Sequence, residues 1–241
     1  GDLSWDRLER LGELSVYDRT AFNLTDKHLV IERGKDADII LLNKTILNRE
    51  MMDQMPYLKY VGVLATGYNI VDVDAAKEKG IVVTNIPTYG TYAVAQMAIA
   101  LLLELCHHAG AHGEAVANGE WAENPDWSFW KYPLVELAGK TIGIIGYGRI
   151  GRTVGGIAKA LGMKVLAMAN NPDHSLEDEM MRYACLDEIL SESDVISLHC
   201  PLTNSTKGII NKDTISRMKD GVMIINNSRG PLIVEEDLRD A

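Results

Sequence analysis

The sequence predicts an α/β protein with two doubly wound parallel-sheet domains joined by a long helix. Short apolar runs alternate with helical patterns along the chain, which is typical of βα units. The alternation occurs twice, before and after a long helical stretch at 92–117. In the second series, a glycine triplet follows one apolar run and opens a helical one, as in dinucleotide-binding folds.

Composition excludes several classes of protein. The 241 residues are enough for two domains, and 46% of them are hydrophobic. A net charge of −10 argues against a nucleic-acid partner, because phosphate binding needs a basic surface. The apolar stretch 97–106 is interrupted by Glu104 and is too short to span a bilayer. Cys106, Cys185 and Cys200 are widely spaced, so we expect reduced thiols and no metal site. Together these features predict a cytoplasmic protein without membrane contact.

The first series of elements fills the amino-terminal third. We expect strands at 14–18, 37–43, 60–66 and 81–86. We expect helices near 5–11, 27–33, 48–55 and 73–79. Gly34 and Gly80 are interpreted as helix stops. The stretch 118–139, with three tryptophans and no clear period, is expected to be an ordered excursion that covers another surface.

The second series follows this excursion. Strands are expected at 141–146, 164–168, 183–186, 195–200 and 221–227. Helices are expected at 149–161, 176–181, 187–191 and 211–218, and another begins within 234–241. Asn211 is a good N-cap for the helix that follows it.

The segment "GIIGYGRIG" carries the most specific local signal. Gly146, Gly148 and Gly151 form the spacing GxGxxG between an expected strand and an expected helix. In such loops the first glycine makes a tight turn, the second lets the backbone approach a pyrophosphate, and the third lets the helix pack closely on the strand. The helix N-terminus then binds the phosphates. We therefore expect a bound dinucleotide.

The residue expected to bind the adenosine ribose is not acidic here. The second strand of this unit ends in "MANNPD", which places Ala169 where a carboxylate usually stands. No arginine replaces it, and Asn170 or Asn171 remains as a hydrogen-bonding partner for the ribose. We expect NAD rather than NADP, with NADP left open.

Four segments together resemble the D-isomer-specific 2-hydroxyacid dehydrogenase family over essentially the whole chain. They are "ATGYNIVDVDAA" (65–76), "NIPTYGTYAVAQMAIALLLEL" (85–105), "SDVISLHCPLTNSTKGIIN" (193–211) and "MIINNSRG" (223–230). The glycerate dehydrogenase (hydroxypyruvate reductase) branch is the most similar. The resemblance implies a flavodoxin-like substrate domain at 1–91 and a Rossmann domain for NAD at 92–241.

The resemblance also implies roles for individual residues. Arg229 would be the catalytic arginine, and the backbone of Ala65, Thr66 and Gly67 would bind the substrate carboxylate. Arg149 and Ile150 would join the three glycines around the pyrophosphate. Cys200, Pro201 and Thr206 would line the adenosine and ribose side. Asn227 and Ser228, with Thr91, would lie near the nicotinamide.

Arg229 follows a buried strand, at the edge of the sheet where α/β proteins bind ligands. A guanidinium there can hold a carboxylate and polarise a carbonyl in a forked geometry that lysine lacks. A surface salt bridge is the structural alternative. The six histidines have structural interpretations: His28 in an early helix, His107 and His108 on the long helix, His112 and His174 exposed, and His199 a satisfied core residue.

The family's acid/base histidine and the glutamate that orients it would follow the arginine strand, so we expect a chain shortened at its C-terminus and slightly at its N-terminus. The expected activity is hydride transfer between NAD(H) and a small 2-oxo acid, best hydroxypyruvate to D-glycerate. The alternative is a dinucleotide-sensing, co-repressor-like protein of the same fold without turnover. The resemblance further implies a homodimer formed through 92–139.

Overall fold

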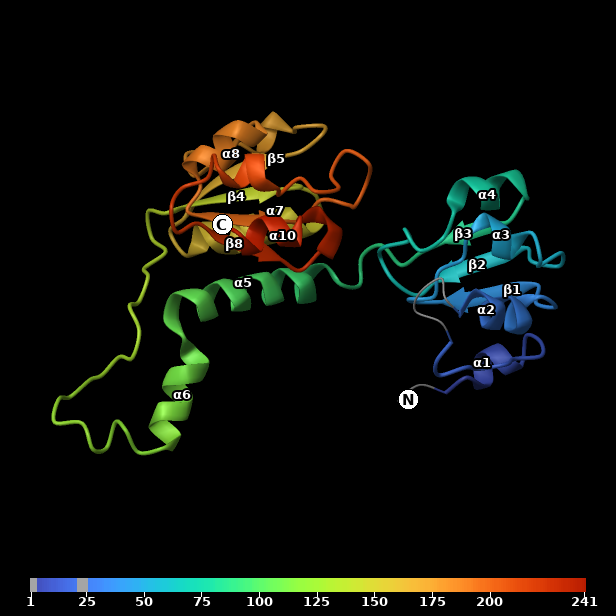
Figure 1. Ribbon diagram of the computed structural model, residues 1–241, viewed down its shortest axis with the longest axis horizontal. Helices are drawn as coiled ribbons and strands as arrows, with labels where there is room; N and C mark the ends of the chain where they lie inside the picture. Colours follow the sequence, from blue (N-terminus) through green and yellow to red (C-terminus); the bar gives the residue numbers. More distant parts are fainter. Residues whose placement is uncertain (1–3, 21–25) are drawn as a thin grey trace. The chain divides into compact units, whose positions relative to one another are not determined.

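The computed structural model describes residues 4–20 and 26–241, and the chain divides into two compact units (Figure 1). The units are Gly1–Thr88 and Tyr89–Ala241. Each has its own parallel sheet and hydrophobic core, so the α/β fold class with two parallel sheets is confirmed.

The N-terminal unit holds a three-stranded parallel sheet in the order β1-β2-β3. Its strands are β1 (Ile39–Leu42), β2 (Tyr60–Val63) and β3 (Val82–Thr84). Its helices are α1 (Asp6–Glu9), α2 (Lys27–Gly34), α3 (Arg49–Met52) and α4 (Val73–Glu78). Asn48 and Asp72 cap α3 and α4 through their side-chain oxygens, which fixes where both helices begin.

The C-terminal unit holds a five-stranded parallel sheet in the order β6-β5-β4-β7-β8. Its strands are β4 (Thr141–Ile145), β5 (Lys164–Met168), β6 (Met181–Tyr183), β7 (Val195–Leu198) and β8 (Met223–Asn226). Its α-helices are α5 (Thr91–His107), α6 (Ala109–Ala117), α7 (Arg149–Ala160), α8 (Leu186–Glu192), α9 (Lys212–Ile215) and α10 (Glu235–Arg239). Two 3₁₀ turns, η2 (His174–Leu176) and η3 (Gly230–Leu232), complete it.

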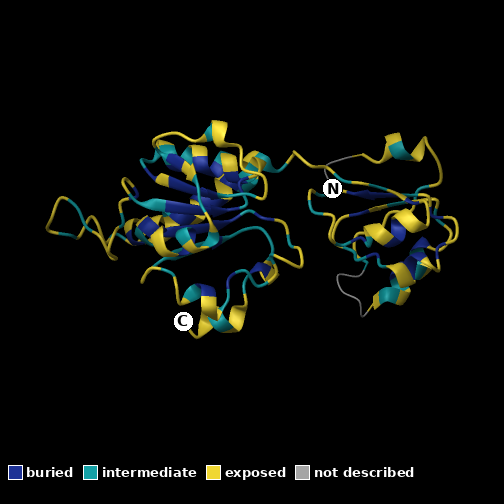
Figure 2. Cartoon of the chain, turned by 90° about the horizontal axis from the view of Figure 1, so that it is seen from above, coloured by how far each residue is buried: buried dark blue, intermediate teal, exposed yellow. Residues whose placement is uncertain are grey.

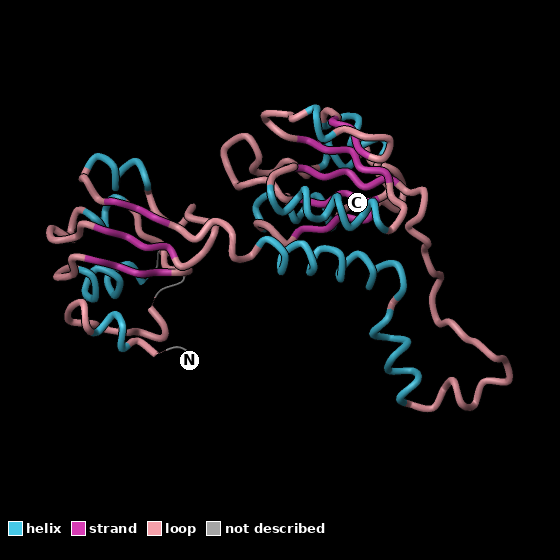
Figure 3. Tube along the Cα trace, turned by 180° about the vertical axis from the view of Figure 1, so that it is seen from behind, coloured by secondary structure: helices cyan, strands magenta, loops and turns pink. Residues whose placement is uncertain are grey.

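Both faces of this sheet are covered. Residues of α5 and α7 form one apolar layer with alternate residues of β4, β5, β7 and β8, among them Ile144 and Ile225. Ile189 and Leu190 of α8 form the opposite layer with Ile145 and Leu198. The strands are accordingly the most deeply buried parts of the unit (Figure 2), and helices flank the sheet (Figure 3). In chain order the strands read 3-2-1-4-5, so the order reverses between β4 and β7, where such sheets bind ligands.

The expected long helix at 92–117 is wrong in one respect, because it is broken at His108. His108 has a left-handed backbone (φ 48°), and α5 and α6 meet there at 62°. Two side chains stabilise the break. Glu104 Oε2 accepts a hydrogen bond from Gly110 N at 3.1 Å, and His112 Nδ1 contacts the carbonyl oxygens of His107 and His108.

Two other expected elements are also wrong. Residues 14–18 form no strand in the structure: Val16 and Tyr17 are exposed, and among the described residues β1 pairs only with β2. The expected helix at 176–181 is replaced by η2 and β6, so the expected weak strand at 183–186 begins earlier, at Met181. Aspartate side chains here bind nearby backbone N–H groups, which favours turns over a helix.

Both expected helix stops lie at helix ends, with different backbone conformations. Gly80 follows Lys79, the C-cap of α4, and has φ +70°, the conformation that ends helices, so this prediction is confirmed. Gly34 is the last residue of α2 and is buried, so this helix also ends where expected, although without a left-handed backbone. A Cβ at that position would come within 2.9 Å of Met55 Cε, so a larger residue there would displace the end of that side chain.

Candidate active site

The glycine loop joins β4 to α7 at the point where the strand order reverses. Gly146 has φ +104°, and a Cβ there would lie 2.4 Å from Cys200 N, so this glycine lets β4 pack against the backbone that follows β7. A Cβ on Gly151 would lie 2.3 Å from the carbonyl oxygen of Gly146, so this glycine lets α7 pack onto the strand. Both positions therefore exclude every other residue type.

Gly148 is different, because a Cβ there would meet nothing within 4 Å. It is exposed and is the N-cap of α7, which has no side-chain cap. The helix thus presents the first-turn N–H groups of Arg149, Ile150 and Gly151 beside open space, which suits a pyrophosphate. These residues fit the dinucleotide that the sequence predicts.

The end of β5 carries no carboxylate toward the ribose position. Ala169 is half-buried and Asn170 is exposed. The nearest carboxylate along the chain, Asp173, accepts a hydrogen bond from Ser175 Oγ at 2.6 Å. That bond lowers the pKa of Asp173 and keeps its side chain in the turn that starts η2. The Asp173 carboxylate is thus hydrogen-bonded within its own turn.

The loop after β7 is held by its own threonines. Thr206 Oγ1 donates to the carbonyl of Pro201 at 2.6 Å and accepts from Thr203 N at 2.8 Å. Cys200 is buried, with its backbone against Gly146. Among the residues assigned to the adenosine side, Cys200 and Thr206 therefore shape the loop, and Pro201 is its exposed member.

The loop after β8 carries Arg229 and is braced from three directions. Asn226 Nδ2 donates to the carbonyl of Arg229 at 2.9 Å, and Asn226 Oδ1 accepts from Ser228 N at 3.0 Å. Ser228 Oγ donates to the carbonyl of Leu198, at the end of β7, at 2.5 Å. Asn227 Nδ2 donates to the carbonyl of Val94 in α5 at 2.8 Å. Arg229 Nη1 contacts the carbonyl of Ser228 at 2.9 Å.

Asn226 was missed among the candidate site residues. An asparagine at the end of a buried strand, three residues before Arg229, is the signal that indicates it, because asparagine side chains commonly close turns of this length. Thr91, assigned to the nicotinamide side, is the first residue of α5. It lies one helical turn before Val94, where Asn227 binds.

The loop expected to bind the substrate lies in the N-terminal unit, after β2. Ile86 N donates to the carbonyl of Ala65 at 3.1 Å, and Asn85 Nδ2 donates to the carbonyl of Thr66 at 2.7 Å. Thr66 Oγ1 donates to the carbonyl of Ile86 at 2.9 Å. Within residues 4–20 and 26–241, the N–H groups of Thr66 and Gly67 have no such partner. The loop is thus fixed with two donors left available.

The histidines differ from expectation at two positions. His112 is not exposed as expected: besides its contacts at the helix break, its Nε2 accepts from Lys131 N at 3.0 Å, which ties α6 to the 118–139 segment. Only one ring nitrogen of His199 is hydrogen-bonded. Nε2 contacts Ser197 Oγ at 2.8 Å, whereas the buried Nδ1 lacks a hydrogen-bond partner among the described residues. Burial lowers the pKa of His199 to about 4. His174 is exposed, as expected.

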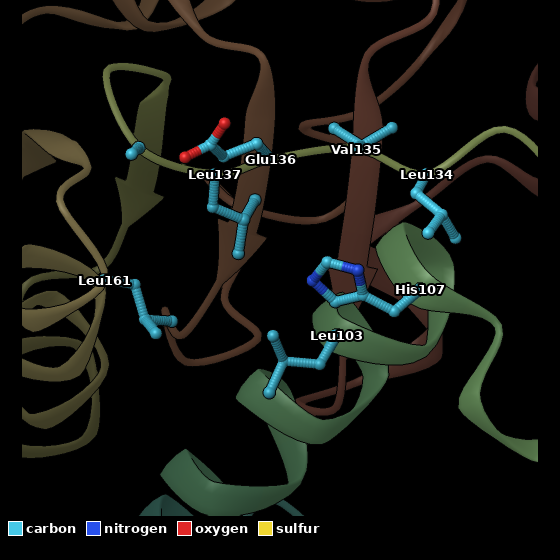
Figure 4. A pocket seen from close by; sticks show the side chains of 8 residues that line it. Leu103, His107, Leu134, Val135, Glu136, Leu137 and Leu161 are labelled. Carbon is cyan, nitrogen blue, oxygen red and sulfur yellow. The ribbon is translucent and has the colours of Figure 1, made fainter. Parts of the chain in front are cut away.

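A shallow cavity of about 350 Å³ lies elsewhere in the C-terminal unit. Leu103 and His107 of α5 face Leu134–Leu137 across it, and Leu161 closes one side (Figure 4). Leu137 and Leu161 precede β4 and β5, so the cavity lies toward the amino ends of the strands, away from the glycine loop. It takes no part in the candidate site.

In the described part of the chain, no group of three or more histidine, cysteine, aspartate or glutamate side chains is placed to hold a metal ion. No single described helix is long and apolar enough to cross a membrane. The bent pair α5 and α6 meets the criterion of length and composition jointly, but Ala98 and Leu102 of α5 are buried against the sheet layer.

Comparisons with known proteins identify the family of the chain. Residues 99–241 match the family model "D-isomer specific 2-hydroxyacid dehydrogenase, NAD binding domain". The chain is 63% identical over its full length to a hydroxypyruvate reductase of Blautia hydrogenotrophica, of which it covers 74%. It is 38% identical to a glycerate dehydrogenase of Methylorubrum extorquens over 88% of the chain and 65% of that protein.

A solved structure extends the comparison to the fold. D-Lactate dehydrogenase from Aquifex aeolicus, complexed with NAD and lactic acid, superposes with a TM-score of 0.84 at 33% identity. The match covers 98% of this chain and 68% of that one. The resemblance read from the sequence motifs and the expected NAD cofactor are confirmed. The chain belongs to the D-isomer-specific 2-hydroxyacid dehydrogenase family.

Proposed function

We propose that this protein reduces hydroxypyruvate to D-glycerate with NADH. The observation that carries the proposal is the braced loop of Arg229 at the carboxyl end of β8. β7 is the one strand between β8 and the glycine loop at the end of β4. A guanidinium at this edge is suited to a small anion beside a dinucleotide. When bound, NADH supplies a hydride to the substrate's carbonyl carbon.

The role of Arg229 follows from its chemistry. Charge builds on the carbonyl oxygen during hydride transfer, and a fixed guanidinium stabilises it. The same fork can hold the neighbouring carboxylate through two parallel N–H donors. We assign the N–H groups of Thr66 and Gly67 to the substrate carboxylate as well, since both are available in a loop held by Asn85 and Ile86.

The choice of hydroxypyruvate rests on the relatives. Those named hydroxypyruvate reductase and glycerate dehydrogenase share 63% and 38% identity with this chain. The test is NADH oxidation with hydroxypyruvate, glyoxylate and pyruvate in the full-length protein, followed by chiral chromatography of the product. The highest kcat/KM with hydroxypyruvate and a D-glycerate product are expected. Binding of NADH without oxidation by any 2-oxo acid would instead favour the dinucleotide-sensing alternative.

We also propose a homodimer formed through α5 and the segment 118–139. One face of α5 packs on the sheet, yet Met97, Leu101 and Leu105 form an exposed apolar stripe on another face. Trp127 is 90% exposed in the segment that follows. Exposed apolar patches of this kind commonly mark protein interfaces, which supports a partner at this surface. Light scattering should give twice the subunit mass for wild type and a monomer for Leu101→Arg. A monomeric wild type would contradict the dimer.

The cytoplasm is the proposed location. Cys106 and Cys200 are buried, Cys185 is exposed, and all three are free thiols. Free thiols of this kind persist in a reducing compartment. Fractionation of the native host with an antibody against the chain would test this, and recovery in an oxidising compartment would contradict it.

A further inference from the structure

Tyr147 lies between the first two glycines of the GxGxxG loop. Its side chain is buried, whereas Gly148 and Arg149, which follow it, are exposed. Gly146 has φ +104°, and Gly148 has an extended backbone. Glycine has the least restricted backbone of all residues, so neither glycine fixes the path of the loop by itself. The tyrosine between them is therefore the residue whose side chain can hold this turn in place.

The backbone of Tyr147 is tied to the neighbouring strand and to α7. Gly146 N and Tyr147 N both donate to the carbonyl oxygen of Met168, the last residue of β5, at 3.0 and 2.8 Å. Arg152 Nε donates to the carbonyl oxygen of Tyr147 at 3.3 Å. These bonds fix where the loop begins, one residue before the N-cap of α7.

The ring of Tyr147 lies against the backbone of α7 at Gly155. A Cβ on Gly155 would lie 2.9 Å from the Tyr147 hydroxyl oxygen, 3.0 Å from Cε2 and 3.3 Å from Cζ. Gly155 is buried and follows Gly151 by four residues, so both glycines lie on the same side of the helix. Tyr147 itself is only 7% exposed. A side chain at position 155 would thus displace the ring from a closely packed site.

Tyr183 of β6 encloses the ring from another side. The two tyrosine rings meet edge to face, with centroids 5.9 Å apart and an angle of 88° between their planes. Tyr183 is held in turn by its backbone N–H, which donates to Glu177 Oε1 at 2.8 Å, and by the ring of His174, 5.5 Å away. The ring of Tyr147 therefore sits between a helix and a strand that are each fixed independently of the loop.

We propose that Tyr147 is a positioning residue for the dinucleotide. Its ring, enclosed between Gly155 and Tyr183, holds the turn that presents the first N–H groups of α7 to the pyrophosphate. A turn flanked by glycines can adopt several conformations, and a binding site needs its donors held in one of them. The ring removes this freedom before the dinucleotide binds, so less entropy is lost on binding.

Two adjacent glycines of α7 provide a matched test. Gly155→Ala places a methyl group against the Tyr147 ring, whereas a Cβ on the exposed Gly156 would meet nothing within 4 Å. Calorimetric titration of the full-length protein should show roughly tenfold weaker NADH binding for Gly155→Ala, the effect of losing about one charge-assisted hydrogen bond. Gly156→Ala should stay within about twofold of wild type, as exposed substitutions usually do. Equal dissociation constants for the two variants would overturn the proposal.

Variants of the tyrosine test the ring itself. Tyr147→Leu removes the ring atoms that contact α7 and should also weaken NADH binding roughly tenfold. Tyr147→Phe keeps the ring and should bind NADH as wild type does. Met163→Ala is the control for a general loss of core packing, because Met163 is fully buried but directly precedes β5, at the opposite end of the strand from the loop. It should lose stability and keep its NADH affinity. Wild-type affinity in folded Tyr147→Leu would contradict the positioning role.

The double variant Tyr147→Leu/Gly155→Ala tests whether the two residues act through their contact. Leucine lacks the ring atoms that the added methyl group meets, so the second substitution should weaken NADH binding no further. Residues in contact show such non-additive effects, whereas independent sites add. Fully additive losses would show that Tyr147 and Gly155 act separately and would overturn the proposal. If one single variant does not fold, the other and its control decide.

ADP-ribose locates the effect within the dinucleotide. It carries the pyrophosphate without the nicotinamide, so Gly155→Ala and Tyr147→Leu should weaken its binding by the same factor as that of NADH. Unchanged ADP-ribose binding in both variants would place the effect outside the pyrophosphate site and contradict the proposal. These measurements need no 2-oxo acid and no turnover. A failure of the proposed reduction of hydroxypyruvate would therefore leave their outcome unaffected.

Discussion

The side chain of Asn226 holds the backbone of Arg229, through a hydrogen bond of 2.9 Å from Nδ2 to the arginine's carbonyl oxygen. The same side chain accepts from Ser228 N at 3.0 Å. Asn226 is the last residue of β8, so these two bonds carry the rigidity of the sheet into the loop. The backbone that carries the guanidinium is thus fixed. A group that stabilises a charge developing during the reaction must be held in place in this way.

Removing that support should lower catalytic efficiency more than stability. Asn226→Ala deletes both bonds, each worth about 1 kcal/mol, so kcat/KM for hydroxypyruvate should fall roughly tenfold. Asn211→Ala is the matched control, since Asn211 also binds backbone N–H groups but caps α9. The control should lose stability and keep its kcat/KM. Equal kinetic losses in the two variants would show that Asn226 has no particular link to the site.

Arg229→Lys tests the guanidinium itself. Lysine keeps the charge and loses the fork, and a single charge-assisted hydrogen bond is worth about 1.5–3 kcal/mol. We expect kcat/KM to fall at least about tenfold. The dissociation constant for NADH, measured by fluorescence titration, should stay nearly unchanged. Activity close to wild type would show that Arg229 does not bind the substrate.

The sequence predicts the site better where a motif constrains the backbone than where side chains meet across the fold. The glycine spacing and the strand before Arg229 are local signals, and the structure has β4, α7 and β8 within a few residues of the expected positions. The pairing of Leu198 with Asn226 depends on the register of β7 and β8, which no local pattern contains. The break at His108 depends on contacts of the Glu104 and His112 side chains, and no sequence pattern predicts these contacts either.

Cofactor preference can be sharpened at the end of β5. Ala169→Asp adds a carboxylate that can accept from a ribose hydroxyl and would repel a 2′-phosphate. A charge-assisted hydrogen bond contributes about 1.5–3 kcal/mol, so calorimetric dissociation constants should favour NADH over NADPH at least about tenfold more than in wild type. Ala169→Asn, without the charge, should give a smaller gain. A tenfold preference of the wild type for NADPH would contradict the expected order of the cofactors.

The buried imidazole of His199 should make the C-terminal unit sensitive to mild acid. Burial lowers the pKa of His199 to about 4 in the folded state, against about 6.5 in an unfolded chain. The unfolded state therefore binds more protons between these values, and the free energy of unfolding falls as the pH drops through that window. The loss is complete below about pH 4 and amounts to about 3 kcal/mol, whereas above about pH 6.5 this group has no effect.

Urea denaturation followed by tryptophan fluorescence measures this loss, because three of the four tryptophans belong to the C-terminal unit. His199→Gln should flatten the dependence of the unfolding free energy on pH between about 6.5 and 4.5, a range above the ordinary titration of carboxylates. His174→Gln, at an exposed position, is the matched control because it leaves the buried imidazole in place. Equal losses of stability in wild type and His199→Gln across that range would show that the ring is not held neutral by burial. A flattened profile in His199→Gln alone would assign the acid sensitivity to the imidazole of His199.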